Sequence, residues 1–248
     1  MATRLPTVNS SQITTNSCSG TPVESTKDRA SRDRKRLPSW FRTSLPIGKS
    51  QSVYNSTLAR VKDNDLNTVC VEARCPNIHD CWGRGTATFM IAGDVCTRGC
   101  RFCAVNTAKT PPPLNPDEPE DLETAIESMG INHAVITVVN RDDLPDGGAN
   151  HYMKCIMAVH DRCPDVGIEL LCSDLDGNLE SLKKLLNGLP IRVFAHNVEC
   201  VPRLDKIVRD RRASFSQSLE ILSEAKNLRP DLKTKTSIMV GIGETDSE

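Results

Sequence analysis

The sequence predicts an α/β protein in which parallel strands form a partial barrel behind an N-terminal extension. Short apolar, β-branched runs each end in polar or glycine-containing sequence and are followed by a helical stretch. This alternation is typical of parallel strands joined by crossover helices. Aromatic residues make up only 4% of the 248 residues, so the core must consist mainly of aliphatic side chains, as in parallel sheets.

Five strand and helix steps are visible, all within residues 86–248. The predicted strands are residues 87–92, 133–139, 167–172, 192–195 and 236–240. The predicted helices are residues 121–129, 149–162, 178–186 and 216–228. A closed barrel of eight such units takes about 250 residues. We therefore expect a barrel that is open after its fifth strand.

The N-terminal part of the chain divides into two further segments. Residues 1–36 are rich in Ser, Thr, Arg and Asp with little apolar periodicity, and we expect them to be a disordered tail. Residues 37–85 form the N-terminal extension. Arg4 is the one basic residue before Glu24, which is too few for an organellar transit peptide. We therefore expect a cytoplasmic protein, with a mitochondrial or plastid location as the alternative if the tail is a transit peptide.

Composition favours metal binding over several other classes. Lys and Arg number 31 against 32 Asp and Glu, so no global positive field recruits nucleic acid, and no run approaches the ~20 apolar residues of a membrane span. We expect neither a nucleic-acid nor a membrane partner. Cysteine occurs 11 times, an odd number, and six of these residues crowd between Cys70 and Cys103. Disulfide-linked pairs would spread through the chain, so metal ligation is the better interpretation.

The most informative motif directly follows the first predicted strand. Cys96, Cys100 and Cys103 form a CxxxCxxC pattern on one short loop. Three thiolates can ligate three irons of a [4Fe–4S] cube and leave the fourth iron open for a substrate. The alternative, a structural zinc site, usually needs four ligands in paired CxxC elements.

A second cysteine triplet lies upstream of the barrel. Cys70, Cys75 and Cys81 form a CxxxxCxxxxxC pattern, with His79 between the last two as a less favoured ligand. The pattern predicts a second cluster on a different element. Cys155, Cys163, Cys172 and Cys200 show no ligand spacing, so we interpret them as core or helix residues.

With both motifs, the chain resembles the lipoyl synthase family of the radical S-adenosylmethionine (radical SAM) superfamily. The resemblance runs from about Leu37 to the end, through the segments NTVCVEARCPN, GTATFM, CTRGCRFCAV, RDDLPDGG, FAHNVE and KTSIMVGIGET. It implies a radical SAM-type barrel, two 4Fe–4S clusters per chain and S-adenosylmethionine as cofactor. Cys96, Cys100 and Cys103 would hold the cluster that cleaves S-adenosylmethionine, and Cys70, Cys75 and Cys81 the auxiliary cluster.

The resemblance further implies an enzyme that inserts sulfur at C6 and C8 of a protein-bound octanoyl group, with the auxiliary cluster as the sulfur source. The expected partners are octanoylated lipoyl carrier domains or the glycine-cleavage carrier protein, and an electron donor of the ferredoxin or flavodoxin type. No catalytic side chain beyond the cluster ligands is expected.

Secondary site residues follow the later strands. Arg141 and Asp142 are candidates for substrate binding, although the Asp-Gly-Gly that follows is equally an ordinary turn. Asn197, Glu199, Gly241 and Gly243 are candidates for binding S-adenosylmethionine, the glycines because they allow backbone to approach a ligand closely.

The chain departs from the family pattern at its end. An Arg-Ser-Ser-Tyr-type motif, whose serine is expected to ligate the auxiliary cluster, is not reached before Glu248, so we expect a fragment. Two alternatives stay open: a methylthiotransferase-like radical SAM enzyme, and an inactive iron–sulfur fragment. The first would carry a basic nucleic-acid-binding module, which is not visible here.

Overall fold

The computed structural model describes residues 45, 47–63, 68–72 and 75–248. The chain divides into a unit that ends at Arg42 and a compact unit from Thr43 to Glu248, and every described residue belongs to the second. The predicted tail, residues 1–36, and the first part of the predicted extension therefore lie outside the described residues.

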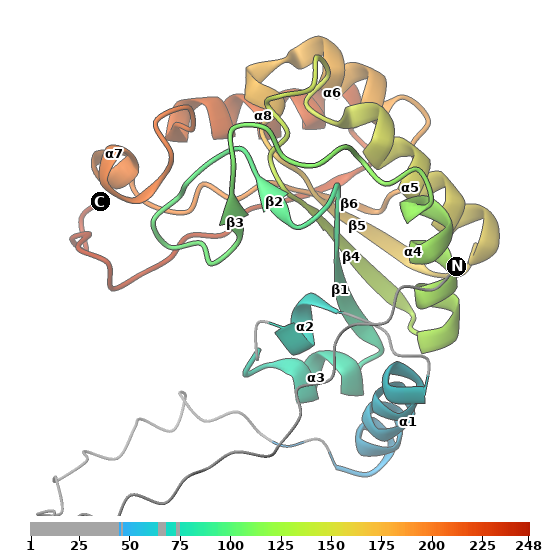
Figure 1. Cartoon of the computed structure of the whole chain (residues 1–248). Helices are drawn as coiled ribbons and strands as arrows, with labels where there is room; N and C mark the ends of the chain where they lie inside the picture. Colours follow the sequence, from blue (N-terminus) through green and yellow to red (C-terminus); the bar gives the residue numbers. More distant parts are fainter. Residues whose placement is uncertain (1–44, 46, 64–67, 73–74) are drawn as a thin grey trace, which may run out of the picture. The chain divides into compact units, whose positions relative to one another are not determined.

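A five-stranded parallel sheet forms the centre of this unit (Figure 1). Its order is β1-β4-β5-β6-β7. The strands are β1 (Thr86–Ile91), β4 (His133–Val138), β5 (Gly167–Leu171), β6 (Val193–Ala195) and β7 (Lys233–Lys235). This confirms the α/β class and the partial barrel, because every neighbouring pair is parallel and the sheet order follows the chain order.

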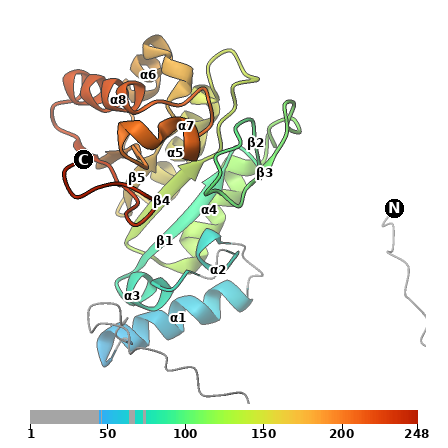
Figure 2. The same ribbon diagram turned by 90° about the vertical axis from the view of Figure 1, so that its left-hand side faces the viewer.

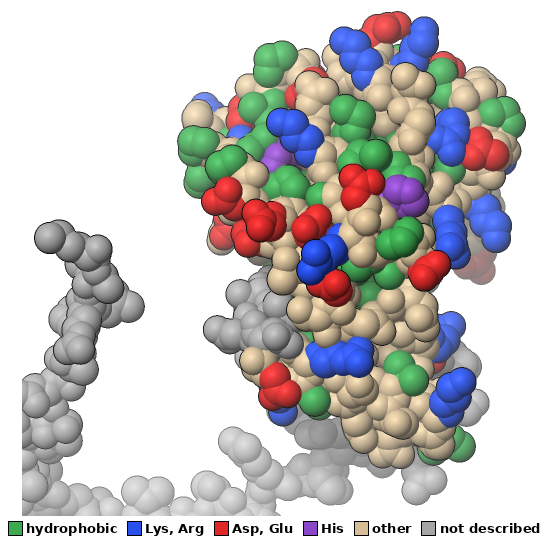
Figure 3. Space-filling model, turned by 90° about the vertical axis from the view of Figure 1, so that its right-hand side faces the viewer, with side chains coloured by type: hydrophobic (Ala, Val, Ile, Leu, Met, Phe, Trp, Pro, Cys, Tyr) green, Lys and Arg blue, Asp and Glu red, His purple; other side chains and the backbone are tan. Residues whose placement is uncertain are grey.

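The helices after the strands cover one face of the sheet (Figures 1 and 2). They are α4 (Glu118–Met129), α5 (Ala149–Arg162), α6 (Leu179–Leu186) and α8 (Phe215–Leu228). Each is amphipathic: α4, for example, buries Leu122, Ile126 and Met129. Figure 3 shows Lys and Arg side chains lying among Asp and Glu side chains on one outer face of the molecule. The predicted helices agree with these four to within three residues, and α5 agrees at both ends.

The strands present different residues to the two sides of the sheet. In β1 the burial alternates, with Ala87, Phe89 and Ile91 buried and the residues between them half-buried. The half-buried Met90 is paired in register with Thr137 of β4, which is paired with Leu171 of β5. These three residues lie side by side on adjacent strands, and all three line one cavity.

The fifth strand was predicted at the wrong place. The prediction of residues 236–240 rested on the apolar run that contains Ile238 and Val240, but β7 is Lys233–Lys235. Its position is fixed by the backbone ladder to β6, in which Val193 is paired with Lys233. All three β7 residues are exposed, so no hydrophobic pattern marks this strand. Ile238 makes only an isolated bridge with Glu199, and it is 46% exposed.

Three helices precede the sheet: α1 (Lys49–Asp63), α2 (Val69–Glu72) and α3 (Ile78–Gly83). α1 packs on α3 and α4, while α2 and α3 contact β1. Trp82 is fully buried, and its ring lies 6.0 Å from that of Tyr54. The extension is thus packed against the first strand of the sheet. Within the described ranges, the remaining short elements are β2 (Val95–Cys96) paired in parallel with β3 (Asn106–Thr107), the 3-10 turns Leu175–Gly177 and Pro202–Leu204, and α7 (Asp205–Val208).

Among the described residues, no helix has the length and apolar character that crossing a bilayer requires.

Candidate functional site

A cavity of about 320 Å³ opens at the carboxyl ends of the strands. This is the edge at which barrels of this type carry their sites. The walls combine residues from inside the strands with residues that directly follow β4, β5 and β6. They include Met90, Val138, Val139, Asn140, Leu171, Cys172, Ser173, Asp174, His196, Asn197, Glu199 and Arg209.

The three cysteines of the downstream motif all line this cavity. Cys96 ends β2 and is buried, Cys100 is half-buried and Cys103 is exposed. The backbone N–H of Arg98 donates to Cys96 Sγ at 3.4 Å, and that of Asp210 donates to Cys100 Sγ at 3.3 Å. Sulfur atoms that accept N–H groups and converge on one cavity fit a thiolate-ligated cluster, whose electronic properties such hydrogen bonds tune.

Arg98 ties the cysteine loop to the ends of two strands. It is 3% exposed, and its guanidinium binds Asp142 after β4 through Nε and Nη2, with the shortest contact at 2.8 Å. Its Nη1 donates to Asp174 after β5 at 2.6 Å. Buried guanidinium–carboxylate hydrogen bonds of this kind fix the orientation of the side chains and also balance their charges. The loop is thereby held over the carboxyl edge of the sheet.

A second anchor comes from the loop after α7. Asp210 accepts from the N–H of Gly99 at 3.0 Å and pairs with Arg212, which lies 3.1 Å from Asp142. Burial opposes ionisation of Asp210, but the hydrogen bonds from Arg212 and from Gly99 prevail and hold its pKa well below the ordinary value. The cysteine loop is therefore bound from both sides by charged groups.

Asn197 and Glu199 line the cavity beyond β6, as the prediction for cofactor-binding residues requires. Glu199 has a left-handed φ of 66°, and burial raises its pKa while a hydrogen bond from Asn197 opposes the rise. Its backbone N–H donates to Ser237 O at 3.2 Å. Glu199 thus lines the cavity from a strained position of the backbone.

Arg141 and Asp142 are held by other protein groups, and neither is among the lining residues of the cavity. Arg141 is buried and binds Asp143 through two hydrogen bonds, at 2.9 and 2.8 Å. Asp142 is the partner of Arg98. Gly241 and Gly243 are exposed with φ of 86° and 116°, and they too are not among the lining residues. The structure therefore does not bring these four candidates to the cavity, and their binding roles stay predictions.

The upstream cysteines lie on the helices packed against β1. Cys70 is in α2 and buried, Cys75 lies between α2 and α3, and Cys81 is in α3. The N–H of Cys75 donates to Cys70 O at 3.1 Å. Burial raises the pKa of Cys81, and the neighbouring Cys75, Asp80 and Cys70 raise it further.

The negative charge that ionised Cys70 and Cys75 place near the Cys81 thiol contributes to this rise in its pKa. The ionised forms of these thiols repel one another, and a cationic metal centre offsets that repulsion. The donor set therefore fits an iron–sulfur cluster. His79 instead lies with its ring 4.6 Å from the ring of Tyr54.

Several site residues were missed by the sequence prediction: Arg98, Ser173, Asp174, His196 and Arg209. His196 is buried between Cys172 O and Ser218 Oγ, each 2.9 Å from one ring nitrogen, and burial lowers its pKa. Asp174 could have been predicted from the sequence, because polar residues that directly follow a barrel strand lie at the edge of the sheet that carries the site. The prediction that the other cysteines are core residues is confirmed for Cys155, Cys172 and Cys200, which are buried.

Comparison with known proteins agrees with this geometry. The radical SAM superfamily model matches residues 90–248, and a model of the N-terminal domain of lipoyl synthase matches residues 10–75. The solved structure of methylornithine synthase superposes with a TM-score of 0.51 at 14% identity, covering 81% of this chain and 55% of that one, which supports the fold. The chain belongs to the radical SAM superfamily, and this membership implies a 4Fe–4S cluster and S-adenosylmethionine.

Within that superfamily the chain is similar to the lipoyl synthases, as the sequence predicted. It is 49% identical over 222 residues to the mitochondrial lipoyl synthase of Bos taurus, covering 87% of this chain and 58% of the relative. It is 48% identical over 227 residues to the mitochondrial enzyme of Drosophila melanogaster, covering 90% and 59%. The chain therefore spans somewhat under three fifths of the length of these relatives.

Proposed function

We propose that this chain carries the activity of a lipoyl synthase, the insertion of two sulfur atoms at C6 and C8 of a protein-bound octanoyl group. The observation that carries the proposal is the similarity to lipoyl synthases along nearly nine tenths of the chain. The match to the lipoyl synthase N-terminal model reaches Cys70 and Cys75, so it includes part of the second cysteine motif. A methylthiotransferase has no such support from the relatives.

The proposal includes two clusters with separate ligand sets. Cys96, Cys100 and Cys103 would hold the radical-generating 4Fe–4S cluster, and Cys70, Cys75 and Cys81 the auxiliary one. When bound, the first supplies the electron that cleaves S-adenosylmethionine, and the second supplies sulfur. Two sites are supported because the triplets lie on different segments of the chain. One lies on the loop after β1, and the other lies on α2, α3 and the link between them.

The remaining residues of the site would position the substrate and S-adenosylmethionine and exclude water. The apolar walls formed by Met90, Val138 and Leu171 would keep water away from the reacting carbon. Asn197 and Glu199 would hydrogen-bond S-adenosylmethionine at the strand edge. Arg141 and Asp142, proposed for substrate, and Gly241 and Gly243, proposed for cofactor, would need a rearrangement to reach the cavity.

Partners and location follow from the same proposal. The substrate would arrive on an octanoylated lipoyl carrier domain or the glycine-cleavage carrier protein, and a ferredoxin or flavodoxin would supply electrons. The expectation of a cytoplasmic protein has no support, whereas the relatives are named mitochondrial. We therefore propose the mitochondrion.

We also propose that the chain consists of a tail (residues 1–36), an N-terminal extension (37–85) and a partial barrel (86–248). The start of β1 at Thr86 agrees with the boundary between the extension and the barrel.

The test is an anaerobic assay with the reconstituted chain, S-adenosylmethionine, a chemical reductant and an octanoylated carrier domain. Mass spectrometry of the carrier is expected to show the addition of two sulfur atoms, together with release of methionine. A matched chain with Cys70, Cys75 and Cys81 replaced by Ala should release methionine without modifying the carrier. If the chain with both clusters intact releases methionine but leaves the octanoyl group unchanged, the proposal that this chain by itself carries the activity is wrong.

A further inference from the structure

The link between β1 and the cysteine loop makes an unusual turn. Ala92 and Gly93 directly follow the strand and have φ of 69° and 87°. Ala92 is buried, and a left-handed conformation costs a residue with a Cβ about 1 kcal/mol or more. Two residues further on, the chain enters β2, which ends at Cys96. The conformation of this turn therefore sets the direction in which the chain approaches the first cysteine.

One carboxylate holds the turn from outside. Glu118, the first residue of α4, accepts from the N–H of Ala92 at 2.8 Å and from the N–H of Gly93 at 3.2 Å. Successive N–H groups in such a turn form a concave site for an anion. Arg141 Nη1 donates to Ala92 O at 3.3 Å, so the peptide groups of the turn are bound on both sides.

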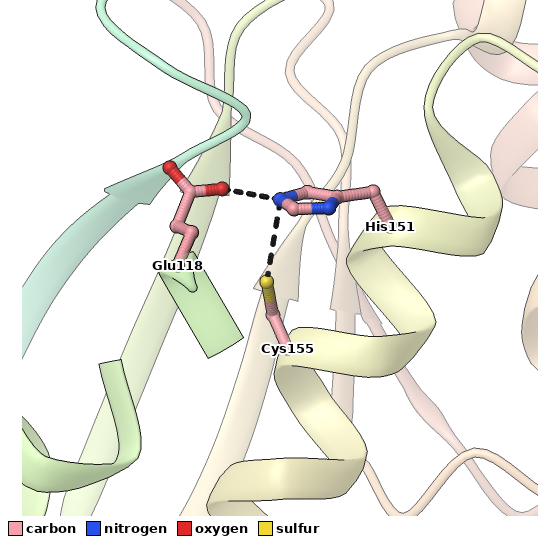
Figure 4. A group of neighbouring side chains, drawn as sticks. All are labelled: Glu118, His151 and Cys155. Carbon is pink, nitrogen blue, oxygen red and sulfur yellow. Dashed lines mark hydrogen bonds and ion pairs between the residues drawn. The ribbon is translucent and has the colours of Figure 1, made fainter. Parts of the chain in front are cut away.

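His151 completes the arrangement from α5. Its Nε2 makes a short contact with Glu118 Oε2, and Cys155 Sγ lies 3.6 Å from the same nitrogen (Figure 4). His151 and Cys155 are one helical turn apart, and both are buried. Two helices and the end of β1 therefore meet at one carboxylate.

Among the described residues, Glu118, His151 and Cys155 are the one group of this kind whose three ligand atoms lie within 4.8 Å of one another, as in a metal site. The contacts instead favour a group of hydrogen-bonded side chains that holds the Ala92–Gly93 turn. Both carboxylate oxygens of Glu118 already accept backbone N–H groups. Burial raises the pKa of Cys155 to about 12, with the Glu118 charge adding to the rise, so its thiol is neutral.

We propose that Glu118 and His151 are positioning residues that fix the Ala92–Gly93 turn and thereby the place of the cysteine loop against the cavity. The proposal rests on the radical SAM chemistry proposed above, but not on the identity of the substrate. It assigns no contact with substrate or cofactor to either residue.

The experiment compares the reconstituted wild-type chain with Glu118→Ala, Glu118→Gln and Cys155→Ala. Two properties are measured: amide hydrogen exchange in residues 90–103, and the kcat and KM of methionine release from S-adenosylmethionine. For Glu118→Ala we expect exchange at least tenfold faster in this segment, with iron content unchanged. We also expect kcat to fall tenfold or more, because a misplacement of about 1 Å costs up to 10²-fold.

Two controls separate positioning from other roles. Glu118→Gln keeps an acceptor for the turn and should restore part of both properties, while Cys155→Ala should match wild type in both. If Glu118→Ala fails to fold, His151→Gln, which leaves the backbone contacts of Glu118 in place, should give an intermediate increase in exchange.

Unchanged exchange in residues 90–103 in Glu118→Ala would overturn the proposal. A wild-type chain that binds one zinc and loses it in Cys155→Ala would also overturn it, in favour of a metal site. A wild-type chain that releases methionine but does not modify an octanoylated carrier would instead refute the proposal that this chain carries lipoyl synthase activity, and it would leave the positioning role intact.

Discussion

Arg98 shows at the scale of one residue how the cysteine loop is secured. It lies between two cysteines of the motif, and its buried guanidinium binds Asp142 and Asp174. Burial opposes its charge, but the hydrogen bonds that it donates to these carboxylates prevail and its pKa is raised. The sequence alone shows Arg98 only as a residue inside CxxxCxxC, because its two partners come from strand ends far along the chain.

Replacing Arg98 by Met should destabilise the protein by about 3–5 kcal/mol, because the buried Asp174 and the half-buried Asp142 lose the guanidinium that they share. Chemical denaturation of the anaerobically purified protein measures the change. Arg162→Met is the matched control: Arg162 pairs with Glu127, but both side chains are about half exposed. No measurable change is expected there. Equal effects of the two substitutions would refute the role of Arg98.

Cys155 provides a pH-dependent prediction. Its pKa is raised to about 12, so the neutral thiol is favoured in the folded state, and this contribution to stability is lost as the pH rises from about 8.5 toward 12. At pH 8 the thiolate fraction is on the order of 1 in 10,000. Iodoacetamide at pH 8 should therefore leave Cys155 unlabelled in peptide mass spectrometry, whereas the half-buried Cys163 becomes labelled. Labelling of both at similar rates would contradict the burial described here.

At the scale of elements, a side-chain cap fixes the start of two helices, α6 and α8, that were predicted to within one residue. Asn178 accepts from Ser181 N at 3.0 Å at the start of α6, and Ser214 accepts from Gln217 N at 3.2 Å at the start of α8. These signals are local. The position of β7 depends instead on pairing with β6, which is not encoded near residue 233, and this is why the apolar run after it was misleading.

The start of α5 provides a prediction at this scale. Gly148 has a φ of 92°, and a Cβ there would lie 2.8 Å from the buried Tyr152 ring. The Tyr152 ring is fully buried and its hydroxyl donates to Gly147 O at 2.8 Å, so a shift of the ring would break this hydrogen bond and disturb the core. Gly148→Ala should cost about 2–4 kcal/mol, the sum of backbone strain and overpacking.

Gly188→Ala is the matched control for this substitution. Gly188 also has a positive φ, of 70°, but no atom would lie within 4 Å of an added Cβ. Strain alone should then cost about 1 kcal/mol in thermal or chemical unfolding. Equal losses in the two variants would mean that the Tyr152 ring does not constrain the turn.

At the scale of the whole molecule, the sequence predicted the cysteine motifs better than the residues that surround them. The two cysteine motifs could be found because their spacing is local. The cavity wall could be predicted only as the set of strand ends, Asp174 and His196 among them, because packing decides which of these side chains line the cavity. Arg141 and Asp142 were chosen by the same strand-end rule, but they bind Asp143 and Arg98 inside the protein. The rule finds the edge of the sheet and not the direction of each side chain.

Counting iron in three forms of the chain tests the central claim most directly, namely that two separate cysteine triplets hold two clusters. After anaerobic reconstitution, the wild-type chain should contain about eight irons. The chain with Cys96, Cys100 and Cys103 replaced by Ala, and the chain with Cys70, Cys75 and Cys81 replaced by Ala, should each contain about four. Only the second variant should still release methionine from S-adenosylmethionine. A wild-type chain with about four irons, or with one bound zinc instead, would contradict the account.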